Sequence, residues 1–473
     1  MLFSSVEFLF RFLPVFMLIY LSVPGKYRNF VLLSGSLLFY GVGEPYNVLL
    51  LIFSILVNYL AGRLMIEKKK KKKRDKKAGK GILTLALVFN FAILFVFKYW
   101  DFTAENINKL STGSIVPLLH LALPLGISFY TFQIVSYLLD CYRQDFYRGR
   151  KKKDASFMEF ATYVSMFPQL IAGPIVKYEE VEEQLKERKI SVRAIENGLK
   201  LFSLGLGFKV LLANQIGTLW NTIMTAGPGN LSAAAAWMGA FAYSFQIYFD
   251  FWGYSLMAKG LGKMLGFKIP TNFQNPYVSK SISEFWRRWH ITLGRWFKEY
   301  LYIPLGGNRK GFFRTAVNLF IVWAFTGLWH GASWNFVLWG LLFFLMVSLE
   351  KTGLGKWLEK KAVLGHLYVI VIIPVTWVIF AISDIKQLLL YLQNMIGIHA
   401  GGVIVGSVQI LRYLKEYGVL FLFCILFATP YPMRLYSQYK NKWYVIVAIV
   451  MIFWFSVYEI MIGSNNPFLY FRF

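Results

Sequence analysis

The 473-residue sequence is poor in charge, in cysteine and in histidine. Only 16% of its residues are charged, whereas soluble globular chains average about 25%. A hydrophobic fraction of 57% excludes an intrinsically disordered chain. The two cysteines cannot build a disulfide framework, and neither they nor the five histidines show metal-ligand spacing. Phosphate-binding loops and serine-nucleophile elbows are absent as well. These absences exclude small disulfide-stapled folds and the common soluble enzyme classes.

Long apolar runs recur along the chain and set its class. Residues 82–100, 367–382 and 443–462 each approach the roughly 20 residues that a helix needs to cross a bilayer. The runs are continuous rather than alternating, which argues against an outer-membrane β-barrel. The sequence therefore predicts an all-α polytopic membrane protein with about 12 transmembrane helices. Re-entrant or interfacial helices are expected beside them.

Basic residues greatly outnumber acidic ones. Fifty-one lysines and arginines stand against 24 aspartates and glutamates, a formal net charge of +27. Cytoplasmic loops of membrane proteins are enriched in Lys and Arg, which explains the excess better than nucleic-acid binding, since no recognition-module signature is present. The basic loop 67–80 is thus expected to be cytoplasmic, which places the N-terminus and the C-terminal tail, 463–473, outside. We expect one domain, 1–473, embedded in a bacterial-type plasma membrane and in contact with its lipid.

Spans are not expected everywhere that the chain is apolar. Residues 157–176 contain Pro168 and Pro174, which break helical hydrogen bonds, so a re-entrant or interfacial segment is expected there. The aromatic and basic segment 264–311 is expected to be cytoplasmic or re-entrant. Clean spans in the first part of the chain are expected at about 3–23, 29–43, 46–66, 82–100 and 118–139.

The stretch 281–311 combines charge with aromatic rings. Read as one helix, it brings Glu284, Arg288 and Arg295 towards one face, and its tryptophans suit a membrane interface. An amphipathic helix lying on lipid explains this pattern, but it leaves His290 at the centre unexplained.

A second polar stretch, 326–340, carries His330 between two apolar runs. Alone, such a histidine is more often a satisfied core residue. Gly327 and Gly331 flank it at a spacing that lets another backbone or a ligand approach closely, which makes His330 a functional candidate. Asp250 lies at membrane depth in another run, where it is expected to pair with an arginine or to bind a ligand.

Five ordered segments resemble one protein family. They are similar to the membrane-bound O-acyltransferases, in the branch of the alginate and peptidoglycan O-acetyltransferases. Trp252 and Leu256 depart from the family pattern, which often has Ser and Asp there. The resemblance implies a multi-span helical fold around a funnel through the membrane. The segments are PLGISFYTFQ (124–133), FPQLIAGPI (167–175), YSFQIYFDFWGYS (243–255), FWRRWHITLGRWFKEYLYIPLGGNRKG (285–311) and GLWHGASWNFVLWG (327–340).

The resemblance also implies an activity. An acetyl group would move from cytoplasmic acetyl-CoA across the membrane, for O-acetylation of an extracellular or cell-wall polysaccharide. Acetyl-CoA would be the donor, and no permanently bound cofactor or metal is expected. His330 corresponds to the histidine of the family's WHG motif and would act as general base, while His290 would orient the thioester. An extracytoplasmic partner of the serine-hydrolase type is also implied.

Further residues follow from this interpretation. Basic side chains are expected to hold the phosphates of CoA by charge, and polar or aromatic ones to line the tunnel. The CoA-binding candidates are Arg287, Arg288, Asn308 and Arg309. The tunnel candidates are Trp329, Asn335, Gln246 and Asp250.

Two other functions stay open at this point. The enzyme could transfer another acyl group, such as D-alanine, to an envelope polymer, and the identity of the donor distinguishes this case. A polysaccharide or lipid transporter would favour two related halves, and the sequence contains no such duplication.

The tail 463–473 resembles the short aromatic C-terminal motif, built around one tyrosine, of this branch. An aromatic anchor at the membrane interface would also explain it. On the enzymatic interpretation, Tyr470 accepts the acetyl group with His330 as base, giving a covalent intermediate.

Overall fold

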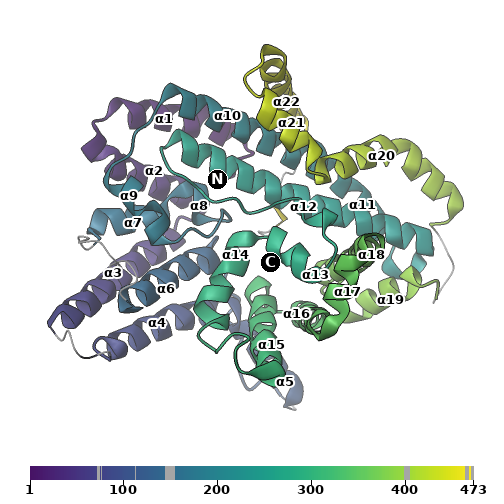
Figure 1. Ribbon diagram of the computed structural model, residues 1–473, viewed down its shortest axis with the longest axis horizontal. Coiled ribbons are helices and arrows are strands. Elements are labelled where there is room, and N and C mark those ends of the chain that lie inside the picture. The colour runs from purple at the N-terminus through teal and green to yellow at the C-terminus, as the bar shows by residue number, and fades with distance from the viewer. Residues whose placement is uncertain are drawn as a thin grey trace. The chain divides into compact units, whose positions relative to one another are not determined.

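The extended secondary structure elements in the residues that the computed structural model describes are all helices, as predicted (Figure 1). In those residues no strands pair into a sheet, and a single backbone bridge joins Leu231 to Val405. Contacts divide the chain into two compact units, residues 1–201 with 258–270, and residues 202–257 with 271–473. The described ranges are 1–71, 75, 77–111, 113–143, 155–398, 405–463 and 468–469.

The first unit contains helices of very different length, from the 4 residues of α8 to the 25 residues of α3. It also takes the first part of α10 (Val192–Gly207) and the end of α12 (Ala233–Met264). Its other helices are α1 (Leu13–Ser22), α2 (Arg28–Gly43), α3 (Asn47–Lys71), α4 (Lys80–Lys98), α5 (Trp100–Leu110), α6 (Ile127–Arg143), α7 (Phe157–Ser165), α8 (Phe167–Leu170) and α9 (Tyr178–Lys186).

Two asparagines join α3 and α4 inside this unit. The Nδ2 of Asn58 donates to Oδ1 of Asn90 at 3.1 Å, and the Nδ2 of Asn90 donates to Oδ1 of Asn58 at 2.6 Å. Each amide also donates one turn back in its own helix, to the carbonyls of Ser54 and Ala86. Both side chains are buried, so the pair satisfies its own polar groups between two apolar helices.

Of two expectations from the sequence for this unit, the interrupted segment 157–176 is confirmed and the start of the span 118–139 is wrong. The stretch 157–176 is not one span: α7 ends at Ser165 and the four-residue α8 follows, with Pro168 in its first turn. The expected span 118–139 is wrong at its start, because α6 begins only at Ile127. Gly126, with φ +75°, makes the turn into the helix, where an added Cβ would meet the carbonyl oxygen of Leu170 at 2.5 Å.

The second unit holds the two histidine stretches that the sequence singles out. It also contains the rest of α10 and α12 and a π-helical segment, Phe208–Asn214. Its other helices are α11 (Gln215–Thr225), α13 (Ile282–Arg288), α14 (Ile291–Phe297), α15 (Gly311–His330), α16 (Trp334–Leu349), α17 (Gly355–Lys360), α18 (Ala362–Ala381), α19 (Ile385–Met395), α20 (Ser407–Ala428), α21 (Tyr431–Tyr439) and α22 (Trp443–Ile462).

Helices α15 and α16 form a tight hairpin at their glycines. A Cβ on Gly327 would collide with the carbonyl oxygen of Phe336, and one on Gly340 would meet that of Trp323 at 2.5 Å. A Cβ on Gly331 would collide with the ring of Phe336. The predicted close approach at Gly327 and Gly331 is therefore confirmed, and its partner is the next helix.

Seven helical stretches in the described residues are long and apolar enough to cross a membrane. An eighth is added if α20 and α21, bent by 69° next to Pro430, count as one span. A multi-pass architecture is therefore confirmed, whereas the number of about 12 spans stays a prediction. The seven are Asn47–Lys71, Lys80–Lys98, Val192–Thr225, Gly311–His330, Trp334–Lys360, Ala362–Ala381 and Trp443–Ile462.

Candidate active site

His290 lies at a break between two helices, not at the centre of one. Helix α13 ends at Arg288, and α14 begins at Ile291. The backbone of His290 is left-handed, with φ 42° and ψ 52°, a conformation in which histidine is enriched among non-glycine residues. The single helix expected over this stretch is therefore wrong. Arg288 does pair with Glu284 at 2.8 Å, but Arg295 belongs to a different helix.

Asn272 explains why the chain breaks there. Its backbone carbonyl accepts from the N–H of Ile291 at 3.0 Å, and its side-chain Oδ1 accepts from the N–H of Thr292 at 3.2 Å. These are the first backbone donors of α14, which have no partner inside the helix. Gln274 N–H donates to the carbonyl of Arg288 at 2.9 Å, so the neighbouring segment satisfies both helix ends.

The same Asn272 orients the imidazole of His290. Its Oδ1 lies 3.2 Å from Nδ1 of His290 and 2.9 Å from Oγ1 of Thr292. The amide orientation is fixed because the backbone N–H of Thr292 can only donate, so the atom facing it is the oxygen. Nδ1 of His290 therefore carries the proton, and Nε2 is left with its lone pair.

The surroundings of His290 keep its ring neutral. The side chain is 1% exposed, and its ring meets that of Phe251 edge-on at 4.7 Å between centroids. Burial lowers the pKa of His290 to about 3. A neutral imidazole with Nδ1 bonded and Nε2 basic can accept a hydrogen bond or polarise a group, but it carries no charge at neutral pH.

His330 is the last residue of α15 and is buried among aromatic rings. Its ring stands nearly perpendicular to those of Trp339 and Phe380, at 5.0 and 5.2 Å between centroids. Trp329 lies between the two histidines, with its ring 6.0 Å from that of His290 and 4.9 Å from that of His330. The structure thus brings His290 of one motif next to Trp329 and His330 of another.

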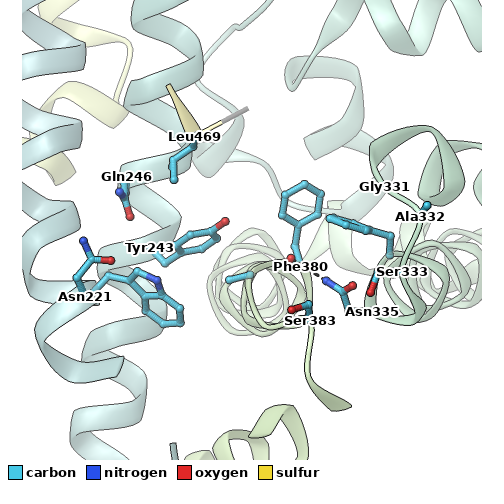
Figure 2. A pocket seen from close by; sticks show the side chains of 13 residues that line it. Asn221, Tyr243, Gln246, Gly331, Ala332, Ser333, Asn335, Phe380, Ser383 and Leu469 are labelled. Carbon is cyan, nitrogen blue, oxygen red and sulfur yellow. Dashed lines mark hydrogen bonds between the residues drawn. The ribbon is translucent and has the colours of Figure 1, made fainter. Parts of the chain in front are cut away.

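A cavity of about 400 Å³ opens beside His330. Gly331, which follows His330, and Phe380, whose ring contacts it, both line this cavity. In Figure 2, Gln246, Tyr243 and Leu469 lie on one side of the space, and Ser333 and Asn335 on the other. The complete lining is Trp220, Asn221, Tyr243, Gln246, Gly331, Ala332, Ser333, Asn335, Phe336, Phe380, Ala381, Ser383 and Leu469.

Two tunnel candidates supply amides to this cavity. Asn335 donates from Nδ2 to the carbonyls of Ile379 and Phe380, at 3.2 and 2.9 Å. These are carbonyls of the last turn of α18, so Asn335 also closes that helix end. The Oδ1 of Asn335 and the Oε1 of Gln246 are buried and accept no hydrogen bond from the described residues. Both oxygens are therefore available to a donor group in the cavity.

Asp250, for which the sequence left an arginine partner or a bound ligand open, is paired with a lysine. Its Oδ1 lies 2.5 Å from Nζ of Lys209. Both side chains are buried, with 2% of Asp250 and 3% of Lys209 exposed. Two glycines bring the helices together: a Cβ on Gly205 would meet the carbonyl of Gly253 at 2.5 Å, and one on Gly253 would meet that of Gly205 at 2.6 Å. This backbone crossing places Lys209 opposite Asp250.

Phe468 and Leu469 of the C-terminal tail lie at this site. The N–H of Leu469 donates to Oδ2 of Asp250 at 2.8 Å. The ring of Phe468 stacks on that of Tyr254 at 4.7 Å and meets Phe251, the neighbour of His290, edge-on at 6.1 Å. Tyr470 lies outside the described residues, as do 464–467 and 471–473.

The CoA-binding candidates lie apart from the cavity. Arg287 is exposed on α13, and Arg288 is occupied by Glu284 and by the carbonyl of Gln274. Asn308 and Arg309 are exposed in the turn before α15, which Asn318 holds by donating to the carbonyl of Gly307 at 2.8 Å. None of the four candidates lines the cavity.

Sequence reasoning missed three residues that shape the site. Asn272 orients His290, Lys209 pairs with Asp250, and Glu350 accepts from the N–H groups of Ile282 and Ser283 at 2.5 and 2.8 Å, which fixes the start of α13. Only Lys209 carries a signal in the sequence, because it is a single cation within an apolar run.

Comparisons with known proteins agree with this arrangement. The model of the "MBOAT, membrane-bound O-acyltransferase family" matches residues 69–393. A probable alginate O-acetylase of Pseudomonas putida is 38% identical over 81% of this chain and 78% of its own length. A peptidoglycan O-acetyltransferase of Helicobacter pylori is 34% identical over 100% of this chain and 98% of its own length. A teichoic acid D-alanyltransferase of Streptococcus thermophilus is 24% identical over 59% of this chain and 72% of its own length.

The family match spans both histidine stretches, the Lys209–Asp250 pair and all of the cavity lining except Leu469. With relatives that align over most or all of the chain, it settles the class of the protein. The chain is a multi-pass membrane enzyme that belongs to the membrane-bound O-acyltransferase family.

Proposed function

We propose that the protein moves an acetyl group from cytoplasmic acetyl-CoA to the outer side of the membrane, for O-acetylation of an extracellular or cell-wall polysaccharide. The relatives named as an alginate O-acetylase and a peptidoglycan O-acetyltransferase support this class of acceptor. The transfer runs in two steps, with Tyr470 as the intermediate acyl carrier.

The observation that carries the proposal is the place of the tail. Leu469 lines the cavity beside His330, and Phe468 packs next to Phe251, which contacts His290. Tyr470 is the residue that follows Leu469 in the chain. An aromatic anchor in the membrane interface would not need a backbone hydrogen bond to the buried Asp250. An acyl carrier needs such a contact, because its hydroxyl must be held within reach of the general base.

In the first step the acetyl group passes from the sulfur of CoA to the phenolic oxygen of Tyr470. His330 takes the proton of the Tyr470 hydroxyl while the phenolic oxygen attacks the thioester carbonyl of acetyl-CoA. A carbon–oxygen bond forms, the carbon–sulfur bond breaks, and the CoA thiolate receives the proton from His330. The products are O-acetyl tyrosine and free CoA, and no oxidant or metal is required.

The remaining residues act before and after that step. Neutral His290, held by Asn272, orients the thioester. The exposed basic groups Arg287 and Arg309 attract the CoA phosphates, and the amides of Gln246 and Asn335 bind the acyl acceptor in the cavity. A separate extracytoplasmic transferase of the serine-hydrolase type then takes the acetyl group from Tyr470 and passes it to the polymer.

One experiment tests both the donor and the carrier. The purified enzyme is incubated with acetyl-CoA, and intact-mass analysis follows its C-terminal peptide. An acetyl adduct that is lost at alkaline pH and is missing in Tyr470→Phe supports the proposal. Tyr470→Phe keeps the ring, so full polymer acetylation by that variant would leave the tail as an anchor and overturn the carrier role.

A second assay, with radiolabelled donors, distinguishes acetyl transfer from transfer of D-alanine. Radiolabelled acetyl-CoA and a D-alanyl-charged carrier protein are offered to membranes that hold the enzyme. Label entering the membrane fraction from acetyl-CoA supports acetyl transfer. Label entering only from the D-alanyl carrier would replace acetyl transfer with the activity that the relative from Streptococcus thermophilus is named for.

A further inference from the structure

The carboxylate of Asp250 serves two partners at once, one on each oxygen. Oδ1 faces the ammonium of Lys209 at 2.5 Å, and Oδ2 accepts from the backbone N–H of Leu469 at 2.8 Å. Leu469 is 219 positions further along the chain. The carboxylate therefore ties the C-terminal tail to two helices of the second unit.

The pair is poorly explained as a device for stability. A buried ion pair loses the hydration of both charges, and apolar residues of the same shape often stabilise a protein as well or better. What an apolar pair cannot do is accept a hydrogen bond from a peptide N–H. The ionised carboxylate can, and such charge-assisted bonds are stronger than bonds between neutral groups.

The contact also sets a register. Asp250 accepts its hydrogen bond from a backbone N–H, which almost every residue type has. The residue that donates is therefore determined by its position along the tail and not by its side chain. The stacking of Phe468 on Tyr254 at 4.7 Å and the burial of Leu469 at the cavity fix which N–H arrives at Asp250. Because the backbone of Leu469 is held at Asp250, the docking contact lies one residue before Tyr470 in the chain.

We propose that the Lys209–Asp250 pair is the docking site of the C-terminal tail, and that Asp250 is a positioning residue for the acyl-transfer step. Lys209 supplies the countercharge that keeps the carboxylate ionised among apolar helices, and Asp250 holds the backbone of Leu469. The docking rests on the contacts above, while the role in transfer rests on the proposed function of Tyr470.

Docking is tested without any substrate. Leu469→Cys is introduced in a chain whose two buried cysteines are removed as Cys141→Ala and Cys424→Ala, and labelling of the introduced thiol by a maleimide is timed in detergent. Asp250→Leu combined with Lys209→Met replaces the pair with apolar groups of similar shape, which keeps the helices packed. Loss of a hydrogen bond to a charged group should speed labelling at position 469 about tenfold or more.

The control is another lysine–carboxylate pair, which lies within helix α9 of the first unit. Lys186 and Glu182 lie 2.6 Å apart in the first unit. Glu182→Leu with Lys186→Met makes the same chemical change and should leave the labelling rate at position 469 as it is in the parent. Equal labelling rates in the parent and in the Asp250→Leu, Lys209→Met variant, with both proteins folded, would overturn the docking site.

A second variant serves if the double substitution prevents folding. Leu469→Pro removes the backbone N–H that donates to Asp250, and Leu469→Ala keeps it. With Phe468→Cys as the reporter, labelling should be faster in the Leu469→Pro chain than in the Leu469→Ala chain. Equal rates in these two chains would contradict the proposal.

The positioning role has its own readout. In the Asp250→Leu, Lys209→Met variant, the acetyl adduct on Tyr470 should form about tenfold more slowly or worse, with the KM for acetyl-CoA unchanged. Faster labelling at position 469 without a slower adduct would refute positioning. Two results together would separate the proposals. If labelling at position 469 is faster in the Asp250→Leu, Lys209→Met variant but Tyr470→Phe still acetylates polymer, the docking site is supported and the carrier role of Tyr470 is refuted.

Discussion

Replacing His330 by phenylalanine separates its chemistry from its packing. The imidazole stands nearly perpendicular to the rings of Trp329, Trp339 and Phe380, at 4.9 to 5.2 Å between centroids. Each such aromatic pair contributes about 0.5–1.5 kcal/mol beyond the area that it buries. His330→Ala would lose all three contacts, so its loss of activity would be hard to assign. His330→Phe keeps an aromatic ring in the same place.

The expected loss of activity follows from the role of a general base. Such a base typically contributes about 10²–10⁴-fold to the rate, which is about 3–5 kcal/mol of activation free energy at 1.36 kcal/mol per factor of ten. The His330→Phe rate of acetyl transfer from acetyl-CoA to Tyr470 should fall by that factor. The thermal unfolding midpoint in detergent should change little, because the packing contacts persist.

The assay is a single-turnover measurement of the acetyl adduct by intact mass, with unfolding monitored on the same preparation. His366→Phe is the matched control, since His366 is a part-buried histidine of the same unit whose Nδ1 contacts the carbonyl of Ser279 at 3.2 Å. Its rate should stay within about threefold of wild type. A folded His330→Phe enzyme that forms the adduct at a rate within about threefold of wild type would refute the reasoning.

Three further predictions concern packing, pH and the basic loop. Gly327→Ala forces a Cβ against the carbonyl of Phe336 and should destabilise the protein by about 1–3 kcal/mol. The control Gly81→Ala, whose Cβ would meet nothing within 4 Å, should not destabilise it. Equal unfolding midpoints of the two variants would contradict the close approach of α15 and α16. His290 has a pKa of about 3 in the folded protein, below the unfolded value of about 6.5. The unfolded state therefore binds the extra proton first as pH falls, and stability should drop by about 1.4 kcal/mol per pH unit between about pH 6 and 4. His290→Gln should remove this part of the slope in pH-dependent unfolding, and an unchanged slope would mean that His290 titrates normally. Shortening the basic loop 67–80 should leave acetyl transfer largely intact in membranes; severe loss would mean that this loop recruits the donor or a partner.

The sequence was sufficient for the class of the protein, which the family match shows. Continuous apolar runs predict membrane helices whatever their partners are, and His330 and Gly327 stand out because polar and small residues are rare in such runs. The structure confirms the close approach at Gly327 and brings His290, Trp329 and His330 together. The prediction at Gly327 succeeds because the small residues that allow the close approach belong to one local stretch of chain.

Predictions that depend on contacts between distant segments fared worse. Nothing around 281–297 indicates that the helix breaks at His290, because the donors and acceptors that satisfy the break belong to Asn272 and Gln274. For Asp250 the sequence left an arginine partner and a bound ligand both open, since a single sequence does not say which group lies across a helix crossing. The partner, Lys209, is selected by the backbone contact of Gly205 with Gly253.

The paired amides of Asn58 and Asn90 have a consequence for how the chain enters the bilayer. Either asparagine alone would carry an unsatisfied amide into lipid, where polar groups are expensive, but together their hydrogen bonds are complete. Helices α3 and α4 are consecutive in the chain. The free-energy cost of placing Asn58 in lipid therefore falls as soon as α4 brings Asn90 beside it. The two helices are therefore suited to leave the insertion machinery as one hairpin, and the asparagines set which faces of the hairpin meet before any later helix is made.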